Sequence, residues 1–156
     1  MKYKILAPTD IHADLIQPSS KSISNRALII NALSLSPYEI ENLSECDDTS
    51  VLVDAFNSED NLFDVKAGGT SMRFLTAFLA KVPGEWIITG TERMKDRPIY
   101  VLVEALNSLG ARINYLGKPG YPPLLIKGSV LEGGEIYLSG DISSQFISAL
   151  LMVAPT

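Results

Sequence analysis

The sequence predicts an α/β domain, taken in the broad sense that includes α+β folds, in which helices pack against sheets. Segments with helical periodicity alternate along the chain with short apolar segments that glycine and proline bound. Hydrophobic residues make up 46% of the 156 positions and charged residues only 20%. This composition provides one sizeable core and argues against a disordered chain.

Apolar periodicity predicts five helices. The strongest pattern begins at Ile99 and ends before Gly110, with Pro98 suited to the first turn. In the first helix, the stripe expected to face the core consists of Ile23, Ala27, Ile30 and Leu33. In the last helix, the expected stripe consists of Phe146, Ala149, Leu150 and Val153. The other helices are predicted over residues 22–34, 44–56, 71–80 and 142–156.

Short apolar segments between these helices predict strands. Each is punctuated by glycine, proline or a polar turn, and none is long enough to be a helix in a domain of this size. The predicted strands are residues 4–7, 38–43, 84–90, 111–116, 123–128 and 134–140.

Composition also narrows the classes of function. The formal net charge of −5 argues against a nucleic-acid binder, and no apolar segment approaches the length of a membrane span or a signal peptide. A single cysteine, Cys46, excludes an internal disulfide and suits a reducing cytoplasm. His12 has no neighbouring cysteine or histidine with which to build a metal site. We therefore expect a cytoplasmic protein without a metal.

Four polar turns lie at the starts of predicted helices, with the sequences SSKSISNR, AGGTSMR, RMKDRP and DISSQF. Backbone N–H groups at a helix start attract phosphate or carboxylate, and Gly68 and Gly69 lack the Cβ atoms that obstruct an approaching ligand. Each turn alone is more typical of a helix cap or a surface loop. Together, however, they hold six of the thirteen basic residues, which predicts a site for a small polyanion: Lys21, Arg26, Arg73, Arg93, Lys95 and Arg97.

The same motifs resemble the 5-enolpyruvylshikimate-3-phosphate synthase family, the enolpyruvyl transferases of the shikimate pathway. The motifs appear in the family's order and cover most of the chain from Pro18: SSKSISNRALIINALS, AGGTSMRFL, TGTERMKDRPI, VEALNSLGARINYL, YPPLLIKG and DISSQFISALLMVAP. The resemblance implies two domains of repeated βαβαββ units with the active site between them. Residues 1–17 would be a strand that enters from the other domain. Residues 18–156 would be a partial domain with a truncated last repeat, about the first third of the family's chain.

The resemblance also implies two neighbouring substrate subsites. Residues expected to bind shikimate 3-phosphate are Ser22, Arg26, Ser143, Ser144 and Gln145. Residues expected at phosphoenolpyruvate are Gly69 and Arg97, with Thr70 and Arg73 shaping that side and Lys21 contacting both substrates. Arg93 and Lys95 match the family's motif as well, and a structural or general electrostatic role is expected for them.

The chain departs from the family's pattern at three places. The family usually has asparagine where this chain has Ala67, and proline or leucine where it has Phe74. The segment between Phe56 and Ala67 is shorter than usual, as if a β-hairpin of the first repeat were omitted. These departures concern the phosphoenolpyruvate side.

The implied reaction transfers the enolpyruvyl group of phosphoenolpyruvate to the 5-hydroxyl of shikimate 3-phosphate and releases phosphate, without a metal or an organic cofactor. The acid and base come from later parts of the family's chain. We therefore expect no catalytic residue in this segment and no activity of this chain alone. The expected partners are the two small metabolites, without nucleic acid or membrane, and the full-length enzyme is expected to be a monomer.

Two other functions stay open on the sequence. The sister family of UDP-N-acetylglucosamine enolpyruvyl transferases usually carries a reactive cysteine near a Pro-Cys-Gly turn, whereas Cys46 lies in the different context SECDD. The second alternative is a non-catalytic anion-binding or interaction domain, which the same polar turns would also suit. A downstream reading frame with further repeats would favour the enzyme over such a module.

Overall fold

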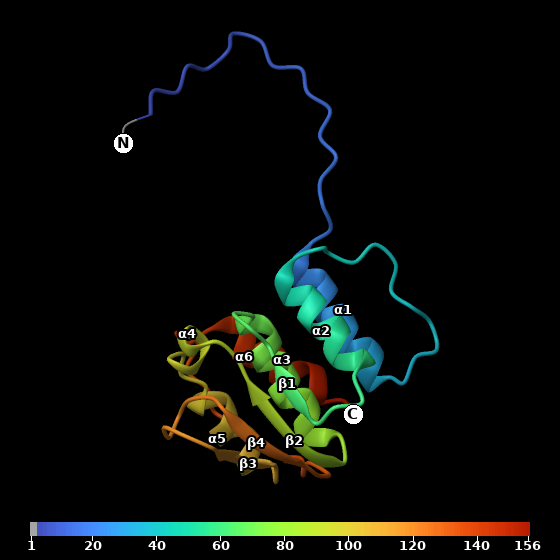
Figure 1. Cartoon of the computed structure of the whole chain (residues 1–156), viewed down its shortest axis with the longest axis vertical. Coiled ribbons are helices and arrows are strands. Elements are labelled where there is room, and N and C mark those ends of the chain that lie inside the picture. The colour runs from blue at the N-terminus through green and yellow to red at the C-terminus, as the bar shows by residue number, and fades with distance from the viewer. Residues whose placement is uncertain (1–2) are drawn as a thin grey trace.

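A computed structural model describes residues 3–156, in which six helices and four strands are formed. Figure 1 shows α1 and α2 side by side at one end of the folded body, with the sheet and α3, α5 and α6 forming the rest. The helices are α1 Lys21–Leu33, α2 Asp47–Asn57, α3 Gly69–Lys81, α4 Glu92–Lys95, α5 Tyr100–Ser108 and α6 Ser144–Val153. The strands are β1 Leu62–Asp64, β2 Gly84–Thr89, β3 Arg112–Tyr115 and β4 Leu124–Gly128.

The four strands form one mixed sheet in the order β1-β2-β4-β3. β1 runs parallel to β2, while β2 and β3 both pair antiparallel with β4. Alternate side chains such as Ile113, Leu124 and Ile126 are buried, as expected for a sheet with one face on the core. The mixed arrangement of helices and sheet confirms the predicted α/β class.

Helix α3 is the centre of the fold. It contacts the sheet as well as α1, α2, α5 and α6, and ten of its thirteen residues are buried. The enclosed position of α3 also buries three polar residues, Thr70, Ser71 and Thr76. Because Phe74 and Leu75 are fully enclosed, the start of α3 at Gly69 is held firmly relative to its neighbours.

The core faces of α5 and α6 agree with the predicted stripes, because Leu102, Val103 and Leu106 are buried on α5. On α6 the buried residues are Phe146, Ala149, Leu150 and Val153.

The stripe predicted for α1 is wrong, because Ile23 and Ile30 are 70% and 52% exposed. The helix instead buries Ile29 with the polar residues Ser24 and Asn25. The reason is a polar contact surface between α1 and the chain around α2. Thr49 Oγ1 donates a hydrogen bond to Asn25 Oδ1 at 2.7 Å, and the Ser44 N–H donates to Ser24 Oγ at 2.9 Å.

Three predicted strands, at residues 4–7, 38–43 and 134–140, are not formed. A strand needs a pairing partner, and within residues 3–156 none lies beside these segments. The structure also contains β1 and the one-turn helix α4, which the periodicity did not predict. The assignment of residues 1–17 to another domain stays a prediction, and its first two residues lie outside the described part.

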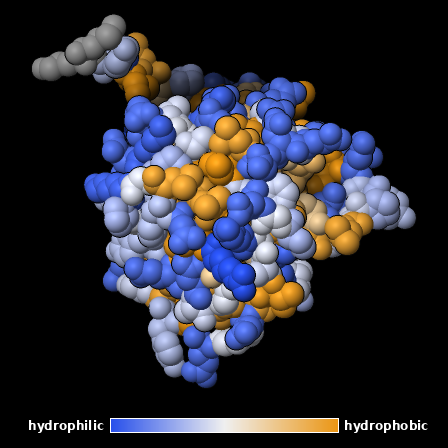
Figure 2. Space-filling model, turned by 60° about the horizontal axis from the view of Figure 1, so that its bottom comes forward, coloured by the Kyte–Doolittle hydropathy of each residue, from blue (hydrophilic) through white to orange (hydrophobic). Residues whose placement is uncertain are grey.

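Large apolar side chains remain on the surface of the described chain. On the face seen in Figure 2, hydrophobic residues form small patches among hydrophilic ones. Elsewhere, Leu15 and Ile16 of the extended N-terminal segment are almost fully exposed. Between residues 3 and 156, no helix has the length and apolar character required to cross a membrane.

Candidate anion-binding site

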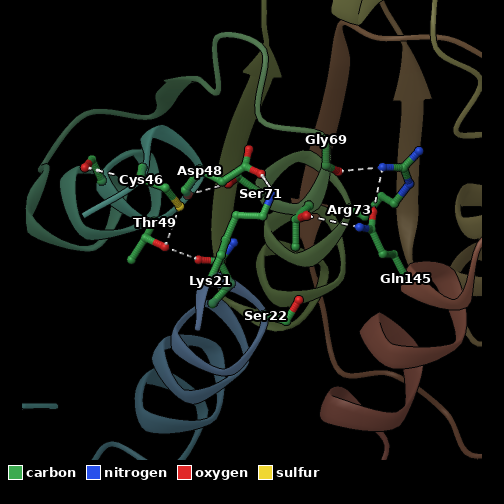
Figure 3. A network of polar contacts seen from close by, with 12 residues as sticks. Lys21, Ser22, Cys46, Asp48, Thr49, Gly69, Ser71, Arg73 and Gln145 are labelled. Atoms are coloured by element: carbon green, nitrogen blue, oxygen red, sulfur yellow. Dashed lines mark hydrogen bonds and ion pairs between the residues drawn. The ribbon is translucent and has the colours of Figure 1, made fainter. Parts of the chain in front are cut away.

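Two sets of polar contacts join the starts of α1, α2 and α6 to the start of α3 (Figure 3). The contributing residues are Lys21 from α1, Asp48 from α2, Ser71 and Arg73 from α3, and Gln145 from α6. Since the N-terminal ends of helices carry partial positive charge, their convergence produces a region that favours anions.

Lys21, at the start of α1, forms an ion pair with Asp48 in the first turn of α2, with 2.9 Å between Nζ and Oδ2. The Asp48 carbonyl oxygen also accepts a 2.7 Å hydrogen bond from Ser71 Oγ on α3. Asp48 therefore connects three helices. Its hydrogen bond and its negative charge raise the pKa of Lys21 above the ordinary value, so the ammonium stays charged at neutral pH.

Asp48→Asn is expected to lower the pKa of Lys21 back toward its ordinary value. The folded-state pKa is raised, so the ion pair stabilises the fold below the unfolded value of about 10.4 and loses this effect as pH rises through the folded value. Because the Lys21 side chain is 48% exposed, the loss of unfolding free energy at pH 7 should not exceed about 1 kcal/mol.

An NMR titration of the Lys21 side chain between pH 8 and 12 measures this shift directly. Asp47→Asn removes the adjacent, exposed carboxylate of the same helix turn and is the matched control. Equal Lys21 titration curves in the Asp48 variant and the unmodified chain would contradict the assignment.

Two arginines flank Gly69 at the start of α3. A Cβ atom added at Gly69 would lie 2.8 Å from Arg97 Nη1 and 2.9 Å from Arg73 Nη1. Within the described residues, neither guanidinium forms an ion pair with a carboxylate. Burial, and then the positive charge of Arg97, lower the pKa of Arg73. Two cations that share a partly enclosed space without a counter-charge would be stabilised by a bound anion.

Arg73 and Thr70 also hold the side chain of Gln145, in the first turn of α6. Arg73 Nη1 donates to Gln145 Oε1 at 2.8 Å, and Gln145 Nε2 donates to Thr70 Oγ1 at 3.1 Å. Ser143 caps α6, since its Oγ accepts a hydrogen bond from the Gln145 N–H. The starts of α3 and α6 are therefore connected through side chains that the motifs had singled out.

Arg26 lies between α1 and α6. Its Nη1 donates to the Ser22 carbonyl oxygen at 2.9 Å, and its Nη2 donates to Ser148 Oγ at 3.0 Å. The guanidinium also lies 5.2 Å from the centre of the Phe74 ring. This cation–π contact gives Phe74 a physical role. Ser22 and Arg26 are four residues apart and share one face of α1.

The structure thus brings together most of the predicted residues. Contacts or close approach directly link Gly69, Thr70, Arg73, Arg97 and Gln145. Lys21 is connected to the start of α3 through Asp48 and Ser71. Ser22, Ser143 and Ser144 are exposed at the starts of α1 and α6. Of the two basic residues in α4, Lys95 pairs with Glu92 and Arg93 is exposed, so neither joins the set.

Sequence reasoning missed the roles of Asp48 and Ser71. Neither residue is among the predicted site residues, and a carboxylate in the first turn of a helix, such as Asp48, is expected in any case because it complements the helix dipole. Its contacts with Lys21 and Ser71, 27 and 23 residues away in sequence, depend on how three helices pack. No local pattern signals such contacts.

The family model of EPSP synthase (3-phosphoshikimate 1-carboxyvinyltransferase) matches residues 5–58 and 55–156. The two matched pieces meet at 55–58, beside the segment that the sequence analysis identified as shortened. The 3-phosphoshikimate 1-carboxyvinyltransferase of Bacteroides fragilis (strain YCH46) is 54% identical over 155 residues, covering 99% of this chain and 38% of the relative. The protein of the same name from Sulfurovum sp. (strain NBC37-1) is 42% identical over 171 residues, covering 93% of this chain and 40% of the relative.

The chain therefore spans about two fifths of the length of these relatives. Among solved structures, the EPSP synthase from Acinetobacter baumannii has the same fold, with a TM-score of 0.75. It is 23% identical, and the superposition covers 87% of this chain and 37% of that one. Since the family model accounts for the sequence from residue 5 to the last residue, this chain belongs to the EPSP synthase (3-phosphoshikimate 1-carboxyvinyltransferase) family.

Proposed function

We propose that this chain supplies most of the shikimate 3-phosphate site and part of the phosphoenolpyruvate site of an enolpyruvyl transferase. The complete enzyme would move the enolpyruvyl group of phosphoenolpyruvate to the 5-hydroxyl of shikimate 3-phosphate and release phosphate. The observation that carries the proposal is the convergence of helix starts around Gly69, where Arg73 and Arg97 lie close together without a carboxylate partner within the described chain. The names of the relatives support the reaction.

Electrostatics explains why such a site suits these substrates. Both carry a phosphate and a carboxylate, and like charges repel strongly where water is excluded. Positioned cations and helix starts offset that repulsion and align the reacting groups without reorganising during the reaction. Lys21, Gly69 and Arg97 are assigned to phosphoenolpyruvate. Shikimate 3-phosphate is assigned to Ser22, Arg26, Ser143, Ser144 and Gln145, with Lys21 between the two.

The groups that transfer protons would come from parts of the relatives that this chain does not match. The proposal for this chain therefore concerns binding rather than turnover. The complete enzyme is proposed to act as a cytoplasmic monomer on these two small metabolites.

Titrating the chain with shikimate 3-phosphate, followed by 1H–15N NMR, tests the proposal. Resonances of Ser22, Arg26 and residues 143–145 should shift in a saturable way. Shikimate, which lacks the phosphate, should produce much smaller shifts at the same residues. No response to shikimate 3-phosphate, or a response confined to other residues, would contradict the proposed site.

Inorganic phosphate distinguishes the rival function. A non-catalytic anion-binding domain would respond to inorganic phosphate as strongly as to shikimate 3-phosphate. A site for the proposed substrate should prefer shikimate 3-phosphate, because the ring hydroxyls and carboxylate add contacts that phosphate alone cannot make.

A further inference from the structure

The side-chain amide of Gln145 has a defined environment at the junction of α3 and α6. Its oxygen accepts from Arg73 Nη1, and its nitrogen donates to Thr70 Oγ1. An amide nitrogen carries two hydrogens, and within the described residues Thr70 is the only acceptor for them. One N–H of Gln145 is therefore left to donate to a ligand.

Thr70 cannot by itself decide which way this amide points. A threonine hydroxyl both donates and accepts, so it would bond equally well to the amide nitrogen or, after a flip, to the amide oxygen. Arg73 is different, because a guanidinium has donors only. Contact with Arg73 therefore requires that the oxygen, and not the nitrogen, of Gln145 faces it.

Arg73 is itself held in place by three contacts, one within α3 and two with α6. Its Nη1 also donates to the Gly69 carbonyl oxygen at 2.8 Å, and its guanidinium lies 5.0 Å from the centre of the Phe146 ring. Its Nε is buried and has no partner within the described chain. Burying the Arg73 guanidinium costs free energy, which indicates that this residue has a role besides packing.

We propose that Arg73 is a positioning residue that fixes the orientation of the Gln145 amide, so that a free N–H faces the bound shikimate 3-phosphate. The inference deepens the proposed function and rests on it for the identity of the ligand. Arg73 acts through Gln145 and makes no contact with shikimate 3-phosphate. Without Arg73, the amide would sample both orientations, and half of them would present an acceptor to an anionic ligand.

The first test observes the amide directly in the full 156-residue chain. Gln145→Glu removes one side-chain NH2 signal from the 1H–15N spectrum and thereby assigns it. In the unmodified chain this signal should show two well-separated proton frequencies and slow exchange with solvent. In Arg73→Met, the frequencies should move toward those of an exposed glutamine whose side-chain amide samples both orientations. The control Arg112→Met, at an exposed position, should leave them unchanged.

Arg73→Gln provides a second variant if Arg73→Met does not fold. A glutamine at this position both donates and accepts, so it can satisfy neighbouring groups but cannot select one orientation of the Gln145 amide. An unchanged Gln145 signal in the variant that folds would overturn the inference.

The second test is a double-mutant cycle on the affinity for shikimate 3-phosphate. Arg73→Met alone should weaken binding about tenfold, the upper end of the effect of one hydrogen bond. In a Gln145→Met background, the same change should weaken binding less than twofold, because Arg73 then has no amide to orient. Equal losses in both backgrounds would mean that Arg73 acts on the ligand directly, which would overturn the inference.

The two tests separate failure of this inference from failure of the proposed function. If the unmodified chain does not respond to shikimate 3-phosphate, the proposed function is wrong, and so is the identity of the ligand assigned to Gln145. If it binds shikimate 3-phosphate but Arg73→Met leaves both the amide signal and the affinity unchanged, only the positioning role fails.

Discussion

Gly128→Ala is expected to lower the free energy of unfolding by about 3 kcal/mol or more. Gly128 ends β4, opposite Gly84 in β2. A Cβ atom added there would overlap the carbonyl group of Val82 and would lie 3.1 Å from the Leu79 carbonyl oxygen. Both obstacles are backbone, so no side-chain rotation relieves them. The end of α3 or the pairing of β2 with β4 would have to shift.

The adjacent residue makes such a shift costly. The Ser129 N–H donates a 2.9 Å hydrogen bond to the Ala80 carbonyl oxygen, which ties the end of β4 to the end of α3. Urea unfolding followed by circular dichroism at 25 °C measures the loss. Gly133→Ala is the matched control, because a Cβ atom there meets nothing within 4 Å. A Gly128→Ala variant as stable as this control would contradict the close packing.

Gly69→Ala is expected to weaken binding of phosphoenolpyruvate or phosphate by about tenfold or more while changing stability little. The added Cβ would approach Arg97 Nη1 and Arg73 Nη1 to within 2.9 Å. These atoms end flexible side chains, so the guanidinium groups would turn aside without unfolding the helix. Displacing two charged hydrogen-bond donors from an anion site costs much more in affinity than in stability, since each contributes about 1.5–3 kcal/mol.

Isothermal titration with phosphoenolpyruvate, together with urea unfolding of the same sample, separates the two effects. Gly140→Ala, at a position with open space around it, is the control for adding a methyl group. Unchanged affinity in Gly69→Ala would show that the two arginines do not hold the anion. A large loss of stability would show instead that Gly69 is needed for folding.

The helices could be predicted from the sequence because their apolar spacing is a local property. The stripe on α6 is buried as its spacing required. The strands were less predictable, since pairing depends on distant residues. Residues 124–128 form β4 because β2 and β3 flank them, whereas the similar alternation in 134–140 finds no partner within the described chain. The three-residue β1 is too short for any periodicity to show.

The candidate site was predictable to a similar extent. Lys21, Gly69 and Arg97 stand in short motifs whose chemistry is visible without a structure. The contact of Lys21 with Asp48 depends on the packing of α1 against α2, and that packing contradicts the apolar stripe of α1. Periodicity favoured Ile23 over Asn25 as the buried residue because it weighs hydrophobicity alone and ignores hydrogen-bond partners on another helix.

The buried contact between Asn25 and Thr49 has a consequence for how α1 is aligned with α2. Asn25 lies about one turn after Lys21, and Thr49 directly follows Asp48. The hydrogen bond between Asn25 and Thr49 therefore also sets the position of Lys21 relative to Asp48 along the helix axis. Sliding α1 by one residue would displace it about 1.5 Å, and by one turn about 5.4 Å. An apolar interface tolerates small slides of this kind, whereas a buried amide and hydroxyl do not. The buried hydrogen bond between α1 and α2 thus fixes the axial register of the two helices and, with it, the position of the Lys21 ammonium group.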